Sequence, residues 1–434
     1  MSFKQGQNIV VVGGGAGGLE LVTKLGRKLG SKGKAQITLI DSSPTHIWKP
    51  LLHEVATGAL DPGLTSLNYR SHSLYNSYKF MLGSLTGINR GRKYITLSPV
   101  LGDMGQEVLP EQTIKYDILV VSIGSISNDF NTPGVSDNCI PLDSTQNACE
   151  FHNKLVNKFI HFENVNNESP SVNVVIVGGG ATGIELAAEL YHTVDNLSHY
   201  GFKKLNTQSL EITVIEASDR ILPPLPSRIS TAVLRDISPM GINVKTNTLV
   251  TKACDGGLET RGGEFIPADL IVWAAGIKAA DILNHLDGLE TNRINQLIVR
   301  KTLQTTVDES VFAIGDCCSC PLTEDKFVPP RAQSAHQMAS HAYKNILAIL
   351  KGTPLSDYVY RDYGSLVSVS QYGTVGTLLS KKGRPLYIEG VVAKLVYLSL
   401  QQIHQVALYG YFKTAALILL SRINRVFHPK VKLH

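Results

Sequence analysis

The fold is decided by two stretches of sequence, Gly13-Gly14-Gly15-Ala16-Gly17-Gly18 and Gly178-Gly179-Gly180-Ala181-Thr182-Gly183. Each stretch follows a run of apolar, β-branched residues, at 8–12 and 172–177, and each opens onto a helical pattern. In a strand-turn-helix unit of this kind the first glycine permits a tight bend, the second lets the backbone approach a pyrophosphate, and the third lets the helix pack close to the strand. The free N–H groups at the start of the helix then face the phosphates. The sequence therefore predicts two dinucleotide-binding units.

Each unit is completed by a later strand that ends in a carboxylate. Residues 37–41 end in Asp41, and residues 212–216 end in Glu216. In dinucleotide-binding units this carboxylate hydrogen-bonds a ribose hydroxyl group. A chain that binds two dinucleotides is expected to pass electrons between them.

More of the chain is repeated than the glycine-rich turns. Residues 116–124 and 268–276 are both buried-strand runs closed by a glycine, which suits a strand end that a dinucleotide approaches. Glycine-punctuated strand signals at 106–114 and 258–266 predict a small antiparallel meander in each copy. A further strand at 311–316 ends in Gly-Asp and precedes a helical stretch.

We therefore predict an α/β fold with two Rossmann-like dinucleotide-binding domains, small antiparallel meanders and a C-terminal membrane-anchoring segment with amphipathic helices. The first domain is expected to comprise residues 1–150 and 300–351, the second residues 151–299, and the C-terminal segment residues 352–434.

The positive charge of the chain is concentrated in its last part. The 434 residues are 43% apolar and 18% charged, as in a globular protein, and carry a net charge of +5. No acidic residue follows Glu389, whereas that part of the chain holds the basic residues Lys394, Lys413, Arg422, Arg425, Lys430 and Lys432. Such a tail could bind nucleic acid or an anionic membrane, and its apolar content favours the membrane.

A helical projection of residues 411–427 supports this interpretation. One arc of about 140° collects apolar residues, and basic and polar residues fill the other half. The arc contains Phe412, Ala415, Ala416, Leu419, Leu420, Ile423, Val426 and Phe427. The longest uncharged apolar run, 414–420, is far too short to span a bilayer. We expect residues 391–434 to lie on an anionic bilayer surface, with packing on the protein's own core or in a homodimer as the alternatives.

The cysteines predict neither disulfides nor a metal site. The first strand begins near Asn8 and leaves no room for a signal peptide, so a cytosolic chain start with reduced thiols is expected. The six cysteines are Cys139, Cys149, Cys254, Cys317, Cys318 and Cys320. The last three form a CxxC spacing, and a metal or redox site is conceivable there. Without a second CxxC or a histidine pair nearby, we expect no metal.

With these pieces assembled, the chain resembles the flavoproteins with two dinucleotide-binding domains, and among them the bacterial type II NADH:quinone oxidoreductases, which do not pump protons. The resemblance covers essentially the whole chain. Besides the two fingerprints with Asp41 and Glu216, it is carried by Glu185, Trp48-Lys49-Pro50-Leu51-Leu52-His53-Glu54-Val55-Ala56-Thr57-Gly58, Ala274-Ala275-Gly276-Ile277, Gly315-Asp316 and Ala332-Gln333-Ser334-Ala335-His336-Gln337. The last motif is similar to the family's AQxAxQ quinone-site signature.

The resemblance implies non-covalent FAD in the first unit and NADH as substrate in the second. For FAD it points to Gly13, Gly14, Gly15, Ala16, Gly17, Gly18, Asp41, Lys49, Gly124, Gly315, Asp316 and Gln333. For NADH it points to Gly178, Gly180, Ala181, Thr182, Gly183, Glu185, Glu216, Ala275 and Gly276. An acid such as Glu216 accepts from a free ribose 2′-OH and repels a 2′-phosphate, which favours NADH over NADPH, although Arg220 leaves NADPH open.

The resemblance also implies a set of catalytic residues. For Lys49, Glu185 and His336 the sequence also allows a simpler role. Lys49 is expected beside the flavin, where its charge favours the reduced ring, or it is a surface cation. Glu185 is expected near the nicotinamide, or it only stabilises the helix start. Gln333 and Gln337 share a helix face and are suited to the two quinone carbonyl oxygens. His336 could deliver a proton, but a lone histidine is more often a satisfied polar residue.

We therefore expect a peripheral enzyme on the cytoplasmic face of the bacterial inner membrane that passes electrons from NADH through FAD to a membrane quinone. No nucleic acid is expected as a partner. Residues 48–58 contain no cysteine, so electrons cannot leave through a dithiol there, as they do in related disulfide reductases. The alternatives are a sulfide:quinone oxidoreductase, which needs cysteines beside the flavin, and a non-catalytic redox sensor that binds both nucleotides.

Overall fold

The computed structural model describes residues 6–102, 104–164, 171–197, 201–369, 373–379 and 385–427. The chain divides into two compact units, and neither is continuous in sequence. Unit 1 comprises Met1–Trp48, Ser66–Ile126 and Ile277–Arg361. Unit 2 comprises Lys49–Thr65, Ser127–Gly276 and Asp362–His434. Each unit contains one of the two fingerprints.

Unit 1 is built on a parallel sheet of five strands in the order β23-β11-β1-β2-β5, as expected of a doubly wound domain. The strands are β1 (Gln7–Val12), β2 (Ala35–Asp41), β5 (Lys79–Leu82), β11 (Ile118–Val121) and β23 (Val311–Ala313). The middle of β1 is buried on both faces, which is why it reads as an unbroken apolar run. Its long helices are α1 (Ala16–Lys28), which follows the fingerprint, and α9 (Ala332–Lys351), and the two pack against each other.

The remaining elements of unit 1 are short. A three-stranded antiparallel meander has the order β10-β7-β6, and two hairpins are β3-β4 and β8-β9. The bounds are β3 (Thr45–His46), β4 (Leu67–Asn68), β6 (Leu85–Asn89), β7 (Tyr94–Leu97), β8 (Val100–Leu101), β9 (Glu107–Leu109), β10 (Gln112–Lys115), β22 (Leu297–Ile298), β24 (Cys318–Ser319), α4 (Tyr69–Asn76), η1 (Gly30–Lys32), η6 (Asp281–His285) and η7 (Gly315–Cys317). The predicted first meander is present.

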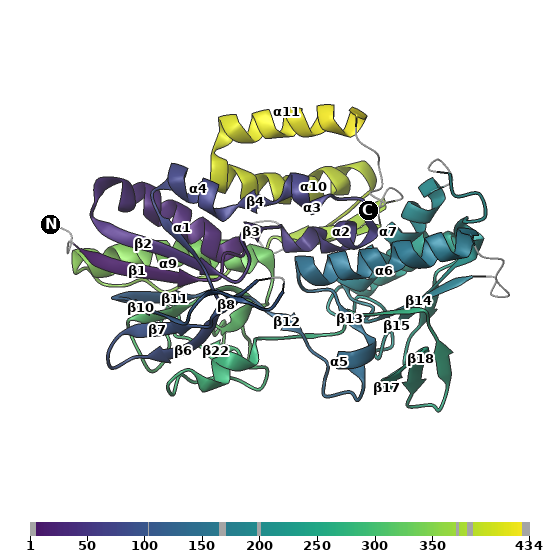
Figure 1. Cartoon of the computed structure of the whole chain (residues 1–434), viewed down its shortest axis with the longest axis horizontal. Helices are drawn as coiled ribbons and strands as arrows, with labels where there is room; N and C mark the ends of the chain where they lie inside the picture. Colours follow the sequence, from purple (N-terminus) through teal and green to yellow (C-terminus); the bar gives the residue numbers. More distant parts are fainter. Residues whose placement is uncertain are drawn as a thin grey trace. The chain divides into compact units, whose positions relative to one another are not determined.

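Unit 2 repeats this plan (Figure 1). Its parallel sheet has the order β13-β20-β14-β15-β16, and its meander has the order β17-β18-β19. The strands are β13 (Ile140–Pro141), β14 (Val172–Val177), β15 (Leu210–Ile215), β16 (Asn243–Lys245), β17 (Val250–Cys254), β18 (Gly257–Thr260), β19 (Phe265–Pro267) and β20 (Leu270–Trp273). The core between this sheet and its meander contains Val175, Ile215, Leu258, Ile271 and Trp273. The second predicted meander is therefore also present.

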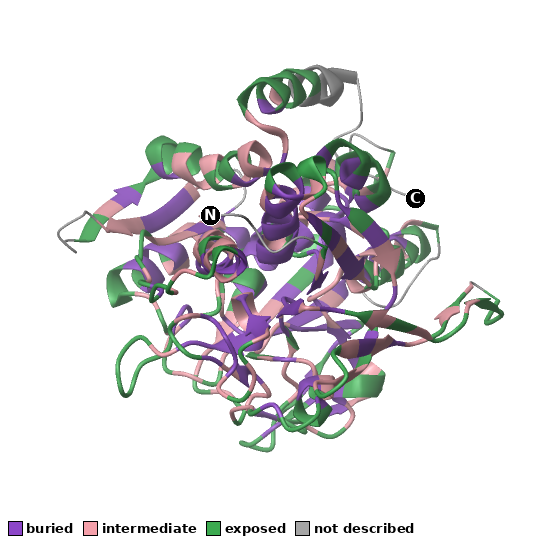
Figure 2. Ribbon diagram, turned by 90° about the vertical axis from the view of Figure 1, so that its left-hand side faces the viewer, coloured by how far each residue is buried: buried purple, intermediate pink, exposed green. Residues whose placement is uncertain are grey.

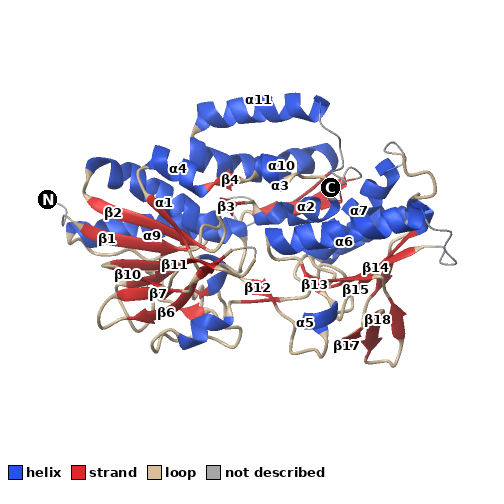
Figure 3. Cartoon of the chain, in the orientation of Figure 1, coloured by secondary structure: helices blue, strands red, loops and turns tan. Residues whose placement is uncertain are grey.

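Helices α6 (Thr145–Asn164) and α7 (Ala181–Leu197) of unit 2 pack against this sheet, and further helices belong to the C-terminal part (Figure 3). The other helices of unit 2 are η2 (Lys49–Leu51), α2 (Leu52–Thr57), α3 (Pro62–Thr65), α5 (Val135–Asn138), η4 (Thr207–Ser209), α8 (Ser227–Ile237), η5 (Ser238–Met240), α10 (Gly390–Tyr409) and α11 (Tyr411–Phe427). The strands β12 (Ile126–Ser127) and β21 (Ile277–Lys278) lie where the chain passes from one unit to the other.

The C-terminal part of unit 2 begins with an antiparallel sheet of β25 (Gly364–Val369), β26 (Gly373–Leu379) and β27 (Pro385–Glu389). This sheet contacts α7, α8 and α10, and α10 packs against α11. The helix predicted over 411–427 is present as α11. Its apolar side chains Phe412, Leu419 and Leu420 are 94%, 62% and 56% exposed, so they do not pack on the protein's own core. Figure 2 shows where exposed and buried residues lie along the chain.

The exposed apolar surface continues onto α10, where Val391, Val392, Leu395 and Ile403 are all more than half exposed. Arg422, Ile423, Arg425, Val426 and Phe427 belong to the predicted arc and its basic face, but their side chains lie outside the described part of the structure, as do Lys430 and Lys432. No helix among the described residues is long and apolar enough to cross a membrane.

The compact units divide the chain differently from the predicted domain ranges. Residues 49–65 belong to unit 2, because α2 packs against α6 and α7. Residues 362–434 also belong to unit 2 and do not form a separate unit, because β25 packs against α7. Residues 277–299, predicted within the second domain, belong to unit 1.

Candidate functional site

Two of the three glycines of the first fingerprint, Gly13 and Gly18, have a steric reason, and the third, Gly15, has none. Gly13 has a φ of 99°, and a side chain there would clash with the backbone of Ser122. Gly18 lies so close to the carbonyl oxygen of Gly13 that a Cβ atom would clash with it. Gly15, in contrast, has nothing within 4 Å of the position of a Cβ atom. The turn therefore leaves an open space at its second glycine, where a pyrophosphate group is expected.

The groups around this space fit a dinucleotide. Helix α1 begins after Gly15 without a side-chain cap and without an acid in its first turn, which leaves its N–H groups available to an anion. The carboxylate of Asp41 accepts hydrogen bonds from the N–H groups of Gly14 at 2.6 Å and Ser43 at 2.8 Å. Asp41 is therefore fixed at the end of β2, beside the turn. The residues present fit FAD.

Helix α9 and the Gly-Asp strand end lie beside α1 in unit 1. A Cβ atom on Gly17 would come within 3.1 Å of the carbonyl oxygen of Ala335, so the two helices approach closely there. Gly315 has a φ of 76° and donates its N–H to the Met338 sulfur at 3.3 Å. Asp316 accepts a hydrogen bond from the Ser125 hydroxyl group at 3.1 Å. Gly124, predicted to contact FAD, precedes Ser125 and has a φ of 74°.

The second fingerprint has the same geometry. Gly178 has a φ of 114°, Gly183 lies against the carbonyl oxygen of Gly178, and Gly180 has open space where a Cβ atom would be. Ala181 and Thr182 are exposed at the start of α7. The structure thus provides a second opening at the carboxyl end of a parallel strand, where dinucleotides bind in such sheets.

Glu216 is held in the same way as Asp41. Its carboxylate accepts from the N–H groups of Gly179 at 2.9 Å and Ser218 at 2.8 Å. Arg220, which left NADPH open, donates to the backbone carbonyl oxygens of Pro223 at 3.0 Å and Leu225 at 3.4 Å. Its guanidinium group is thus tied to its own loop, which weakens the case for a bound 2′-phosphate.

Ala275 and Gly276 follow β20, the closing strand of unit 2. Gly276 has a φ of 62°, and a Cβ atom there would lie 2.5 Å from the ring of Phe130. Phe130 is 61% exposed. It could not be predicted from the sequence, because it belongs to no motif and comes from a distant loop. Its ring flanks the strand end that was predicted to contact NADH.

Glu185 lies in a buried polar cluster of unit 2. Its carboxyl group accepts a hydrogen bond from the Ser368 N–H at 3.0 Å, and its second oxygen lies 3.7 Å from Nδ1 of His53. The hydroxyl group of Tyr397, on α10, faces the same carboxyl group. The sequence motifs contain Glu185 and His53, but they do not indicate that the two side chains meet. Ser368 and Tyr397 belong to no motif and come from elements that are distant in sequence.

The cluster is electrically neutral near pH 7. Burial, with the negative charge of Glu54, raises the pKa of Glu185 to about 8 against the opposing effects of Ser368 and Tyr397. Burial lowers the pKa of His53 to about 4, although a hydrogen bond with the Pro50 backbone opposes this. A protonated carboxyl group therefore faces a neutral imidazole, and Glu185 can release or accept a proton close to physiological pH.

Lys49 opens η2 and has an exposed side chain. It belongs to unit 2, whereas the first fingerprint belongs to unit 1. Its predicted place beside the flavin stays a prediction.

His336, on α9, forms an ion pair with Glu20 of α1. Glu20 is fully buried and also pairs with Lys24 at 2.5 Å. Burial raises the pKa of Glu20, but His336 and Lys24 outweigh it and hold that pKa below its ordinary value. His336 thus connects α9 with α1. The feature of the sequence that could have indicated this contact is Glu20, an acid within the apolar run of α1.

The two glutamines of α9 are partly buried. The amide group of Gln337 donates to the carbonyl oxygen of Arg361 at 2.8 Å and accepts from its N–H at 3.0 Å. An amide group can make further bonds, since one hydrogen and one lone pair remain. Gln333 lies one helical turn earlier on the same face.

The CxxC segment lies in the core of unit 1. Cys317, Cys318 and Cys320 are buried, and Cys317 donates to the carbonyl oxygen of Ile314 at 3.3 Å. Burial raises the pKa values of Cys317 and Cys320 to about 12. Thiols of this kind stay protonated and are poor nucleophiles or metal ligands. Among the described residues, no group of three or more His, Cys, Asp or Glu side chains is arranged to hold a metal ion.

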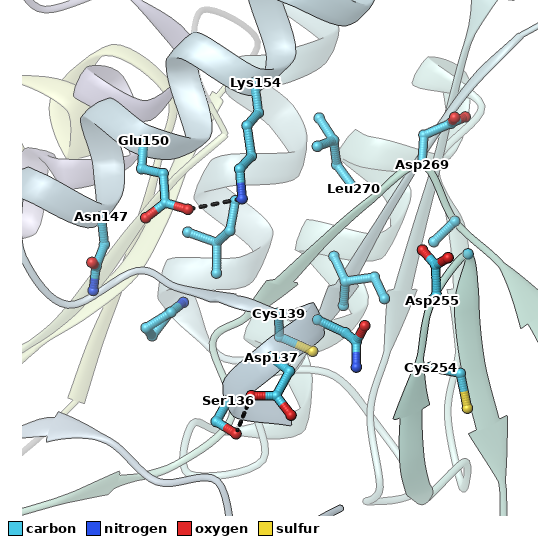
Figure 4. A pocket seen from close by; sticks show the side chains of 16 residues that line it. Ser136, Asp137, Cys139, Asn147, Glu150, Lys154, Cys254, Asp255, Asp269 and Leu270 are labelled. Atoms are coloured by element: carbon cyan, nitrogen blue, oxygen red, sulfur yellow. Dashed lines mark hydrogen bonds and ion pairs between the residues drawn. The ribbon is translucent and has the colours of Figure 1, made fainter. Parts of the chain in front are cut away.

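A pocket of about 430 Å³ in unit 2 is lined by α5, α6 and the ends of β17 and β20 (Figure 4). Asp137, Asp255, Asp269 and the Glu150–Lys154 ion pair give it a polar wall. It adjoins the first residues of β20, whereas the fingerprint follows the last residue of β14. The pocket is therefore at the opposite edge of the parallel sheet from the dinucleotide opening.

Comparison with known proteins shows the family of this chain. The model of the pyridine nucleotide-disulphide oxidoreductase family matches residues 7–339. The type II NADH:quinone oxidoreductase of Haemophilus influenzae is 48% identical over 99% of this chain and 100% of its own length. This chain belongs to the type II NADH:quinone oxidoreductase family. A member of the family from Staphylococcus saprophyticus is 27% identical over 86% of this chain and 90% of its own length.

Solved structures share the fold. NDH2 from Plasmodium falciparum in complex with NADH matches with a TM-score of 0.81 and 18% identity, over 99% of this chain and 100% of that one. The sulfide:quinone oxidoreductase of Aquifex aeolicus matches with a TM-score of 0.73 and 18% identity, over 93% and 92% of the two chains. At such identities the likeness concerns the fold alone. The family membership thus rests on the sequence relatives.

Proposed function

We propose that this chain transfers a hydride from NADH to FAD and then two electrons to a membrane quinone, without pumping protons. FAD, when bound, supplies the carrier that takes up the electron pair and passes it on. One observation supports this most strongly: a chain of this family keeps two fingerprints, each with an open second glycine and a carboxylate fixed beside it.

We assign FAD to the first fingerprint and NADH to the second. Gly15 and the start of α1 bind the FAD pyrophosphate, and Asp41 binds the ribose. Gly180, Ala181 and Thr182 bind the pyrophosphate of NADH, and Ala275 and Gly276 line its path. Glu216 orients the ribose and excludes a 2′-phosphate.

Glu185 is proposed to hold the proton that accompanies electron transfer. Its carboxyl group is protonated below a pKa of about 8 and is enclosed by Ser368 and His53, so little water reaches it. The charge on Lys49 is proposed to favour the reduced flavin.

The quinone is proposed to bind at α9. Gln333 donates a hydrogen bond to one carbonyl oxygen, and the unused N–H of Gln337 serves the other. His336 is held by Glu20, which fixes the start of α9 against α1 and keeps the imidazole ring beside the two amides.

A steady-state assay of the purified protein with a short-chain quinone tests this function. NADH is expected to support rapid turnover. Turnover with NADPH is expected to be at least about 100-fold slower, because Glu216 opposes the extra phosphate. Sulfide is expected to support none, since the buried thiols stay protonated. Turnover with sulfide and not with NADH would contradict the proposal, as would slow turnover with every acceptor, the behaviour of a redox sensor.

We further propose that α10 and α11 lie on an anionic bilayer, on the cytoplasmic face of the inner membrane where NADH is available. The exposed Phe412, Leu419 and Leu395 provide apolar surface, and Lys394 and Lys413 provide positive charge beside it. This placement brings the enzyme to its lipid-soluble acceptor.

Replacing Phe412 and Leu419 with serine is expected to weaken binding to vesicles of mixed neutral and anionic lipid by about 100-fold, because two large apolar side chains lose their burial in lipid. Vesicle flotation measures the effect. The control is Leu101→Ser, a replacement of a 62% exposed leucine in unit 1, which should leave binding unchanged. Unchanged binding of the double variant to vesicles would contradict the lipid contact. Loss of a stable homodimer with unchanged vesicle binding would contradict it as well.

A further inference from the structure

Each fingerprint has a further glycine between its first and second glycines, Gly14 in one and Gly179 in the other. The surroundings of these two residues differ. A Cβ atom on Gly179 would lie 3.0 Å from Cβ of Glu216 and 3.2 Å from the Ile221 side chain, within its own nucleotide-binding loop. A Cβ atom on Gly14 would instead clash with the hydroxyl group and ring of Tyr69. Gly14 has no positive φ to explain it. The first fingerprint therefore needs glycine here because an aromatic side chain fills the space.

Tyr69 is the first residue of α4 and is only 2% exposed. Its hydroxyl group donates to the carbonyl oxygen of Gly14 at 2.8 Å, and the His46 imidazole also hydrogen-bonds the Gly14 backbone. The N–H of Gly14 donates to Asp41. Polar groups thus hold the Gly14 residue through both its N–H and its carbonyl oxygen, immediately before the open Gly15.

The ring of Tyr69 is itself held in place. It stacks on Phe80 of β5 with 5.1 Å between ring centroids and 26° between ring planes. At the other end of α4, Asn76 hydrogen-bonds His72 and accepts from Arg27 of α1 at 2.7 Å. The helix that carries Tyr69 is therefore bound to the helix that follows the fingerprint.

The hydroxyl group remains a donor throughout the working pH range. Burial and the nearby charge of Asp41 raise the pKa of Tyr69 well above its ordinary value. In the second fingerprint the corresponding carbonyl oxygen, that of Gly179, accepts instead from the backbone N–H of Leu222 at 2.8 Å. Among the described residues of unit 2, no aromatic side chain lies against Gly179 as Tyr69 lies against Gly14.

We infer that Tyr69 is a positioning residue for FAD, which fixes the Gly14 peptide so that Gly15 and the first N–H groups of α1 stay directed at the pyrophosphate. Preorganisation of this kind strengthens binding by reducing the loss of loop freedom. It suits a cofactor that must stay bound through many turnovers, whereas the second fingerprint serves a substrate that leaves in each. The inference rests on the assignment of FAD to the first fingerprint.

Tyr69→Phe keeps the ring stacking and removes the hydroxyl group. We expect the dissociation constant for FAD, measured from flavin released on dilution of the holoenzyme, to rise about tenfold, because the buried Gly14 carbonyl oxygen loses the hydrogen bond from Tyr69. The dissociation constant for NADH should stay within twofold of the wild-type value. Gly14→Ala, which displaces the Tyr69 ring, should release FAD more readily still.

The matched control is Tyr75→Phe, the same chemical change on the same helix at a side chain that is 77% exposed. It should leave FAD bound as in the wild type. FAD affinity within twofold of wild type in Tyr69→Phe would overturn the inference. Weaker NADH binding with unchanged FAD binding would instead overturn the assignment of nucleotides to the two fingerprints, which separates the two failures.

Discussion

Gly180→Val is expected to raise the KM for NADH by about 100-fold while FAD remains bound. Apart from its chain neighbours, no described residue has an atom within 4 Å of the Cβ position of Gly180, so we expect the fold to tolerate a side chain in this space. The same space is where the NADH pyrophosphate is expected, and a side chain there keeps the phosphates from the N–H groups of α7. Steady-state kinetics and the flavin content of the purified variant measure the two effects.

The corresponding variant of the first fingerprint, Gly15→Val, provides the control for this result. The Cβ position of Gly15 is equally open, and here the side chain should expel FAD and leave NADH binding intact. Loss of FAD in Gly180→Val, or of NADH binding in Gly15→Val, would mean that the two nucleotides were assigned to the wrong fingerprints.

Glu185→Gln is expected to change both stability and turnover, with opposite signs. The pKa of Glu185 is raised from 4.5 to about 8, so below pH 4.5 folded and unfolded chains both carry the proton. Between these values only the folded chain holds it. Each pH unit in this window therefore lowers the free energy of unfolding of the wild type by about 1.4 kcal/mol relative to the glutamine variant, which cannot ionise.

The advantage of the glutamine variant should grow from near zero at pH 4.5 to about 4 kcal/mol at pH 8 and then level off near about 5 kcal/mol. Urea unfolding at several pH values measures it. The control Glu150→Gln, on α6, changes a half-exposed carboxylate paired with Lys154 and should show no such growth. A pH-independent difference for Glu185→Gln would show that its carboxyl group is ionised in the folded protein.

Turnover with quinone should fall about 100-fold in Glu185→Gln, because the amide cannot exchange a proton in the way a carboxyl group does. Reduction of the bound flavin by NADH should change much less. A variant that turns over at the wild-type rate would reduce Glu185 to a structural role.

The local parts of both sites could be predicted from sequence. The glycine positions and the acidic strand ends depend on strands, turns and helices that are each local in sequence, so the strand-turn-helix pattern is sufficient to predict Gly15, Gly180, Asp41 and Glu216 as nucleotide-binding residues. The amphipathic pattern of α11 was also sufficient, because an exposed helix keeps its periodicity.

The supporting contacts could not be predicted. Ser368 and Tyr397 reach Glu185 from the C-terminal sheet and α10, and Tyr69 reaches Gly14 from 55 residues away. Such contacts depend on tertiary packing, for which a single sequence contains no periodic signal. The grouping of residues 49–65 with the second fingerprint could not be predicted either, because it depends on the packing of α2 on α6 and α7.

Rapid mixing with flavin absorbance as the readout tests the central claim most directly. The oxidised holoenzyme is mixed without oxygen first with NADH and then with a short-chain quinone. We predict rapid bleaching by NADH and equally rapid recovery with the quinone. Bleaching by sulfide alone, or slow recovery with every quinone, would contradict an electron path from NADH through FAD to quinone.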